Sequence, residues 1–542
     1  MSAVVYPARR IITMDSRRPF ATHIAVRDGR IVAVGSVDDI GAVGPNRVDR
    51  RFVDHTILPG LIEGHAHVHE GGMWNFVYTG YFDRRDPDGN LWSGLRSPEA
   101  VIARLREAQA ALAQSDKPLI AWGHDPIYWG GRRLTRYDLD AVSSTRPIVI
   151  LHASLHLMTV NSAMLERAGL RRGVSIEGVP CLPDGEPSGE LREFAAMYFV
   201  KRVIGDPVGS FGSDASVLWR YAALAQRAGV TTTTDLNAKL DDAQLANYLE
   251  VTADDRFPVR LVPLLSGAYH PPRDGALRAS AIAAKSTDKL RLGMVKLFVD
   301  GSIQGFTARI RSQSYYNGAP NGQWITSPQE LTATVDHYHS MGLRLHIHNN
   351  GDEATEVALD ALEAALTAHP RHGHGHTLQH CQMADEMQFK RMARLGIQVN
   401  LFANHIYYWG DVHYSTTLGP EVAERMDACA MASRCGVNFS VHSDASITPL
   451  SPLFTAWCAA NRVTASGRIL GRDERIGVPQ ALHAITLGAA RTLGLENEVG
   501  SLEVGKRADL VALEEDPLDI DPRALRDVRV RATALGGRVF EA

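Results

Sequence analysis

Two histidines, His65 and His67, are separated by one residue directly after a short apolar segment. Alternate side chains of an extended chain point to the same face, so both imidazoles can reach one point. Imidazole at this spacing suits zinc and similar divalent cations. Alone, the pair is weak evidence for a site, because a chain with 22 histidines also contains such pairs by chance, mostly on its surface.

Other residues that can bind metals recur after further apolar segments. They are Lys296, His346, His348, His380, His442 and Asp444. Together with the first pair, five predicted strands offer such side chains at the same end, and chance does not readily produce that recurrence. The pattern therefore predicts a site for one or two divalent cations, and zinc is the ion that we expect.

The elements that carry these residues alternate with amphipathic helical stretches such as 353–368 and 421–435. This alternation is typical of βα units around a parallel sheet. Eight strands predict an α/β fold with a closed (β/α)8 TIM barrel, whose active site lies at the C-terminal ends of its strands. The predicted strands are 56–62, 230–235, 260–265, 294–299, 343–347, 377–379, 397–401 and 437–441.

Both ends of the chain are rich in β-type sequence, with turns at Asp28-Gly29 and Gly536-Gly537. We predict a small β-sandwich domain built from residues 1–57 and 496–542, around the barrel at 58–495. A large insertion after the first strand, about 70–212, has strand-like segments at 119–122 and 148–151 and most of the tryptophans. Long insertions at this place are often lids or pocket walls.

Composition is that of a globular protein, with 45% hydrophobic and 22% charged residues and a net charge of −4. This charge argues against nucleic acid or an anionic membrane as a partner. The five cysteines form no Cys-x-x-Cys pair, and neither a signal peptide nor a membrane span is recognisable. We expect a cytoplasmic protein that acts on a small molecule, and a homo-oligomer is compatible with the sequence.

Lys296 lies inside an apolar run, where a charged amine is costly. One explanation is an ion pair with Asp300 or another carboxylate. The other is a neutral amine that has reacted with carbon dioxide, which gives a carbamate able to bridge two cations.

The segment 59–67, Pro-Gly-Leu-Ile-Glu-Gly-His-Ala-His, resembles the opening of the amidohydrolase superfamily. The chain is similar in particular to the YtcJ-like branch, which includes N-substituted formamide deformylase. The motifs that support this resemblance lie at 295–302, 348–352, 379–382, 443–444 and 500–510.

The resemblance implies a two-metal centre. His65 and His67 would hold one ion, and His348 and His380 the other. Lys296, carboxylated at its side-chain nitrogen, would bridge both ions, and Asp444 would bind the first ion and move the proton of the attacking water. His348 is preferred to His346 because its spacing to Gly351-Asp352 matches the family.

The resemblance also implies hydrolysis of a carbon–nitrogen bond, in an amide or N-substituted formamide. Alternatives are a cyclic amide, a carbamate or a deamination substrate, a one-metal enzyme with unmodified Lys296, and a non-catalytic barrel. We expect neither a serine triad nor a nucleotide site, because the motifs for both are missing. The candidate substrate-binding residues, for which ordinary packing is the alternative, are His442, His346, Trp74, His124, Trp129 and Tyr407.

Overall fold

The computed structural model describes residues 2–41, 44, 46–112 and 117–542. It divides into two compact units. The first unit comprises residues 1–67, 222–300 and 308–542, and the second comprises residues 68–221 and 301–307. All the predicted metal-binding residues belong to the first unit.

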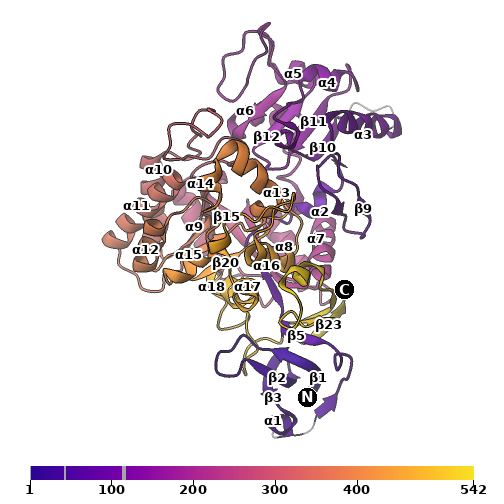
Figure 1. Cartoon of the computed structure of the whole chain (residues 1–542), viewed down its shortest axis with the longest axis vertical. Helices are drawn as coiled ribbons and strands as arrows, with labels where there is room; N and C mark the ends of the chain where they lie inside the picture. The colour runs from indigo at the N-terminus through magenta and orange to yellow at the C-terminus, as the bar shows by residue number, and fades with distance from the viewer. Residues whose placement is uncertain (1, 42–43, 45, 113–116) are drawn as a thin grey trace. The chain divides into compact units, whose positions relative to one another are not determined.

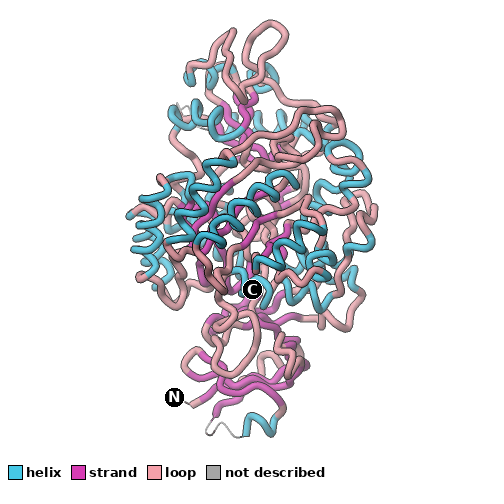
Figure 2. Tube along the Cα trace, turned by 90° about the vertical axis from the view of Figure 1, so that its left-hand side faces the viewer, coloured by secondary structure: helices cyan, strands magenta, loops and turns pink. Residues whose placement is uncertain are grey.

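Eight parallel strands form the centre of the first unit (Figure 2). They follow one another in the sheet in chain order. The first and last strands meet through a bridge between Ala66 and Ala445, where the His67 amide donates to the Ala445 carbonyl at 2.6 Å. The predicted TIM-like barrel is thus present. Its strands are β6 (Leu61–Glu63), β14 (Val230–Ala238), β15 (Arg260–Ser266), β16 (Met294–Phe298), β17 (Arg344–Asn349), β18 (Thr377–His380), β19 (Gln398–Leu401) and β20 (Phe439–Val441).

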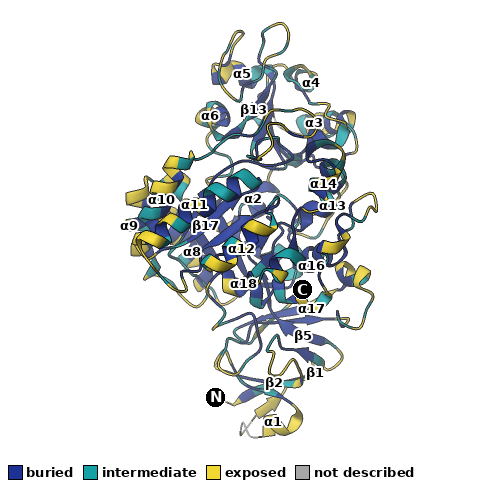
Figure 3. Ribbon diagram, turned by 60° about the vertical axis from the view of Figure 1, so that its left-hand side comes forward, coloured by how far each residue is buried: buried dark blue, intermediate teal, exposed yellow. Residues whose placement is uncertain are grey.

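Helices carry the outer, more exposed surface around these buried strands (Figures 1 and 3). They include α8 (Asp242–Ala253), α9 (Pro272–Ala283), α10 (Pro328–Ser340), α11 (Asp352–Ala368), α12 (Glu386–Leu395) and α16 (Pro452–Asn461). The helix predicted at 353–368 corresponds to α11. The single helix predicted at 421–435 was wrong, because α14 (Pro420–Ala423) and α15 (Cys429–Arg434) are separated by Asp427, whose backbone is left-handed with φ 47°.

The strands of both termini form one eight-stranded sheet. The predicted strand 56–62 is in fact two strands: β5 (Thr56–Pro59) belongs to this terminal sheet, and β6 belongs to the barrel. Gly60 allows the switch, because a Cβ at this position would lie 2.1 Å from the Thr231 hydroxyl. The other strands are β1 (Ala3–Ile12), β2 (Phe20–Arg27), β3 (Arg30–Gly35), β4 (Asn46–Val48), β21 (Leu510–Leu513), β22 (Val530–Leu535) and β23 (Arg538–Glu541).

The second unit has a five-stranded sheet of its own. Its strands are β7 (Val77–Tyr78), β10 (Leu119–His124), β11 (Ile148–His152), β12 (Leu157–Val160) and β13 (Glu190–Arg192), and α3 (Pro98–Ala111), α5 (Ser162–Ala168) and α6 (Glu193–Ile204) are its longer helices. Asn161 caps α5 by accepting from the Met164 amide at 3.1 Å.

Among the described residues, no helix is both long and apolar enough to cross a membrane, and the five cysteines are free thiols.

Candidate metal centre

Side chains from three strand ends meet around Asp444, three residues beyond β20. Its Oδ1 lies 3.4 Å from His65 Nε2 and 3.3 Å from His67 Nε2. Its Oδ2 lies 3.8 Å from His380 Nδ1. Because parallel strands of a barrel end on the same face, residues 300 or more positions apart come together here.

A second contact joins the ends of β17 and β18. His380 Nε2 lies 3.1 Å from His348 Nδ1, and the Asn350 side-chain amide nitrogen lies 3.2 Å from His348 Nε2. Two imidazole nitrogens this close can share one proton or face one cation. This contact places His348 beside His380.

Lys296 is fully buried between these groups. Its Nζ lies 3.5 Å from His65 Nε2 and 5.2 Å from the centre of the Phe298 ring. Burial lowers the pKa of Lys296 to about 7, although the negative charge of Asp444 acts in the opposite direction. A substantial fraction of this amine is therefore neutral near neutral pH.

Three imidazoles of the site are also held in their neutral form. Burial lowers the pKa values of His65 and His380 well below the usual range, and the neighbouring Lys296 and histidines lower them further. For His442, burial lowers the pKa to about 3. Neutral imidazoles keep the lone pair that a cation needs.

Glu63 connects the two strands that close the barrel. Its buried carboxylate accepts from the His65 amide at 3.1 Å and from the Ser443 hydroxyl at 2.6 Å, and the Ser443 amide also donates to it. Burial raises the pKa of Glu63 to about 8, while these hydrogen bonds lower it. The segments that carry His65 and Asp444 are therefore fastened to one side chain.

Two further carboxylates hold ligand segments in place. Asp300 accepts from the backbone amides of Arg309, Asn350 and Gly351, each at 2.9 Å, and so orders the turn after His348. Asp235 lies 3.9 Å from His67 Nδ1, and the Tyr248 hydroxyl donates to it at 2.5 Å. The sequence analysis predicted no role for Asp235. Asp300 was predicted only as an ion-pair partner of Lys296.

His380 and Asp444 both have left-handed backbones, with φ 73° and 50°. This conformation is uncommon for residues other than glycine, and such strain concentrates at functional sites. Asp444 is held in it by hydrogen bonds within its turn, because the Ile447 amide donates to its carbonyl at 2.6 Å.

The arrangement fits a divalent cation. Two groups offer ligand atoms within 4.8 Å of one another: His65, His67 and Asp444, and His65, His380 and His442. Within the described part of the chain, His380 Nδ1, Asp444 Oδ1 and both ring nitrogens of His442 are buried without a hydrogen-bond partner. Buried polar atoms are rarely left in this state, and neutral imidazoles with a carboxylate are the ligands that zinc prefers.

The other predicted residues have different surroundings. The ring of His442 lies among the ligands, stacked on His65 at 4.6 Å and on Phe402 at 4.7 Å. His346 lies one layer deeper in the barrel, with Nδ1 2.7 Å from the Gln379 side-chain amide nitrogen. Tyr407, in α13 (Asn404–Val412), packs against Phe454 and Trp457 of α16.

Three predicted pocket residues belong to the second unit. His124 is fully buried beside the rings of Trp129 at 4.8 Å and His152 at 4.9 Å. Trp74 packs edge-on against Trp122 at 5.2 Å. Their part in substrate binding stays a prediction.

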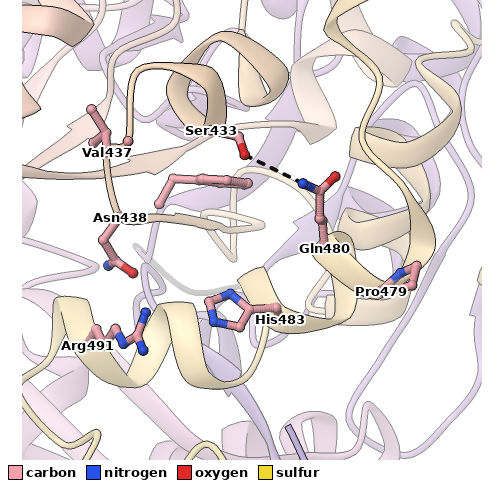
Figure 4. A pocket seen from close by; sticks show the side chains of 9 residues that line it. Ser433, Val437, Asn438, Pro479, Gln480, His483 and Arg491 are labelled. Carbon is pink, nitrogen blue, oxygen red and sulfur yellow. Dashed lines mark hydrogen bonds between the residues drawn. The ribbon is translucent and has the colours of Figure 1, made fainter. Parts of the chain in front are cut away.

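A cavity of about 490 Å³ lies at the opposite, N-terminal end of β20 (Figure 4). Its wall includes Val437, Asn438 and Phe439 at the start of the strand, with His483 and Arg491. Asp444 follows the other end of β20, so this cavity is distinct from the histidine cluster.

Comparison with known proteins places these features in context. A model of the family described as "Amidohydrolase family" matches residues 54–540. The chain is 27% identical to N-substituted formamide deformylase of Arthrobacter pascens, over 97% of this chain and 96% of that protein. It is 24% identical to the putative amidohydrolase YtcJ of Bacillus subtilis, over 98% and 97%. An uncharacterized metal-dependent hydrolase from Pyrococcus horikoshii has a similar structure, with a TM-score of 0.72 and 21% identity over 96% of this chain and 99% of that one.

Proposed function

The chain belongs to the amidohydrolase family, and from this premise we propose that it hydrolyses a carbon–nitrogen bond other than a peptide bond in a small molecule. The observation that carries the proposal is the convergence of His65, His67 and His380 on Asp444. The named formamide deformylase among the relatives makes N-substituted formamides and amides the first substrates to test.

We assign the ligands residue by residue. His65 and His67 hold one cation with Asp444, and His348 and His380 hold a second. A bound divalent cation supplies an acidified water and polarises the substrate carbonyl. Glu63 fastens the segments that carry His65 and Asp444 to each other, and the ligand atoms of His65, His67 and Asp444 lie within 4.8 Å of one another. These contacts fix the place of that chemistry.

Asp444 is the proton carrier in this proposal. Its Oδ1 has no hydrogen-bond partner among the described residues, so it is available to accept the proton of the attacking water. The same carboxyl then donates this proton to the leaving nitrogen, which must be protonated before the carbon–nitrogen bond breaks. His348 and His380 complete the catalytic group as ligands of the second cation.

Lys296 is proposed to carry a carboxyl group on its nitrogen and to bridge two cations. Carbon dioxide reacts with a neutral amine, and burial keeps a fraction of Lys296 neutral near pH 7. The proposal is supported by the 3.5 Å approach of Nζ to the ligand atom of His65.

We propose His442, His346 and Tyr407 of the first unit, and Trp74, His124 and Trp129 of the second, as substrate-binding residues. Rings of this kind suit an aryl or alkyl substituent on the substrate nitrogen. Residues 1–57 and 496–542 are likewise proposed as a β-sandwich accessory domain, and residues 70–212, approximately, as an insertion in the barrel.

Metal removal and a substrate screen test the function. We expect thorough chelation to abolish hydrolysis of N-substituted formamides, amides or carbamates, and zinc, cobalt or manganese to restore it. Metal content is measured in parallel. An enzyme that stays fully active after its metal has demonstrably been removed would refute the proposal.

A further inference from the structure

A layer of hydrogen-bonded polar side chains lies inside the barrel next to the histidines. Gln379, Asn400 and Ser440 are neighbours across β18, β19 and β20, and all three are fully buried. The Ser440 hydroxyl donates to Asn400 Oδ1 at 2.8 Å, and Asn400 Nδ2 donates to Gln379 Oε1 at 3.0 Å. Apolar side chains usually fill the interior of such a barrel, so this layer calls for an explanation.

The layer ends on two histidines. Gln379 Oε1 lies 2.7 Å from His65 Nδ1, and Gln379 Nε2 lies 2.7 Å from His346 Nδ1. An amide oxygen can only accept, so the proton of the first contact must be on His65 Nδ1. A neutral imidazole has one N–H, and the lone pair of His65 is therefore on Nε2.

His65 Nε2 is the nitrogen that faces Asp444 and Lys296, at 3.4 and 3.5 Å. The direction of the Gln379 amide thus decides whether His65 can bind a cation. With the amide reversed, Nε2 of Gln379 would donate to His65 Nδ1, and the proton of His65 would move to the nitrogen that faces the site. Hydrogen bonds that set the tautomer of a ligand histidine in this way commonly change metal affinity 10–100-fold.

The same amide also distinguishes His346 from the ligands. Gln379 donates to His346 Nδ1, so that nitrogen is occupied inside the layer. His348, two residues further along β17, has its Nδ1 beside His380. The choice between the two histidines therefore follows from which of them faces the polar layer.

We propose that Gln379 is a positioning residue that fixes the metal-binding tautomer of His65, and that Asn400 sets the direction of the Gln379 amide. This inference rests on the metal centre proposed above and extends it to two residues with no previously assigned role.

The test measures binding of Co²⁺ and Zn²⁺ to metal-free protein by competition with a chromophoric chelator, together with the visible spectrum of the Co²⁺ form. Gln379→Met keeps the length of the side chain and removes both hydrogen bonds, and it is expected to weaken binding roughly 10–100-fold. Gln379→Glu keeps an acceptor for His65 Nδ1, and it is expected to stay within about 3-fold of the wild type and to preserve the Co²⁺ spectrum.

Asn400→Asp gives an independent reading with Gln379 intact. A carboxylate at position 400 can only accept, so Gln379 must turn its Nε2 toward it and toward His65 Nδ1. We expect weaker metal binding and a changed Co²⁺ spectrum. The matched control is Gln398→Met, because Gln398 Oε1 accepts from Asn438 Nδ2 at 2.6 Å near the other end of the same strands, away from the histidines.

The outcomes separate cleanly. Equal losses of metal affinity in Gln379→Met and Gln379→Glu would mean that the polar layer has only a structural role. Tighter metal binding by Gln379→Met would mean that the Gln379 amide points in the reverse direction. Either result overturns the inference. Thermal unfolding of the metal-free proteins shows whether each variant is folded. If a Gln379 variant is unfolded, the metal affinity of Asn400→Asp tests the inference instead. Wild-type protein that binds metal but hydrolyses no substrate would refute the proposed function and leave these binding comparisons valid.

Discussion

Two clusters of histidines lie at opposite ends of the same barrel. The upper cluster, at the C-terminal strand ends, comprises His65, His67, His348, His380 and His442. The lower cluster comprises His339, His374 and His376, next to the N-terminal ends of β17 and β18. Burial lowers the pKa of His65, His380 and His442 in the upper cluster. It also lowers the pKa of the three histidines in the lower cluster, so a lowered pKa does not distinguish a site from a structural cluster.

Hydrogen bonding distinguishes the clusters. In the lower cluster all six ring nitrogens are paired: His339 with His376 and the His369 carbonyl, His374 with the Leu395 carbonyl and the His376 amide, and His376 also with the Leu345 amide. In the upper cluster His380 Nδ1 and both nitrogens of His442 are unpaired within the described residues. A paired imidazole stabilises the fold, whereas an unpaired one is available to a ligand.

The largest expected effect is a loss of kcat when Asp444 at the upper end of the barrel is replaced. Asp444→Asn should lower kcat by at least about 100-fold, because the variant cannot carry a proton between water and the leaving nitrogen. Much of the metal should remain, since the histidines are intact. Steady-state kinetics and metal analysis check this. The control is Asp336→Asn, which removes an exposed carboxylate 3.5 Å from His369 at the lower end and should leave kcat unchanged. Full activity of Asp444→Asn would eliminate the assigned role.

Replacing one histidine of each cluster by phenylalanine tests this contrast. His380→Phe should lose metal and turnover while the chain stays folded. His376→Phe should keep metal in the folded protein but lower the free energy of unfolding by about 2–6 kcal/mol, because it leaves the Leu345 amide and His339 Nδ1 unpaired at about 1–3 kcal/mol each. Metal analysis and denaturant unfolding measure both quantities. Loss of metal from the folded His376 variant would contradict the division.

The positions of the upper ligands were predictable because they depend on a local pattern. A strand followed directly by a histidine or aspartate is visible in the sequence, and the barrel brings all such ends to one face. His372-x-His374-x-His376 has the same spacing as His65-x-His67. It differs only in that it precedes β18 instead of following a strand, so a small error in a strand boundary could reverse its interpretation.

The supporting residues could not be predicted from the same pattern. Gln379, Asn400 and Glu63 act through partners on other strands, and those contacts depend on the register between strands. The break between β5 and β6 has a similar origin. Residues 56–62 look like one continuous strand locally, and only the pairing of β5 with β21 separates the two parts.

A smaller effect is expected where an unpaired imidazole is replaced by an apolar ring. His442→Phe keeps the stacking on His65 and Phe402 and removes two buried polar atoms without partners. The metal-free protein should be as stable as the wild type, or more stable by about 1 kcal/mol. Denaturant unfolding with chelator present measures this, beside the destabilised His376→Phe. A loss above about 2 kcal/mol would show that His442 has a structural partner and belongs with the lower cluster.

The smallest expected effect concerns acid. Burial lowers the pKa of His374 below its usual value of 6.5, so below pH 6.5 the unfolded chain binds more protons than the folded one. The stabilisation by neutral His374 is therefore complete above pH 6.5 and is lost as the pH falls, by at most about 1.4 kcal/mol per pH unit.

His374→Gln removes this titration and can still donate to the Leu395 carbonyl. With chelator in both samples the upper cluster contributes equally and cancels in the difference. The unfolding free energies of wild type and variant should run parallel above pH 6.5 and converge below it as the wild type loses stability. Curves that stay parallel down to pH 5 would mean that His374 binds a proton in the folded state without cost, and the lower cluster would then have spare hydrogen-bonding capacity like the upper one.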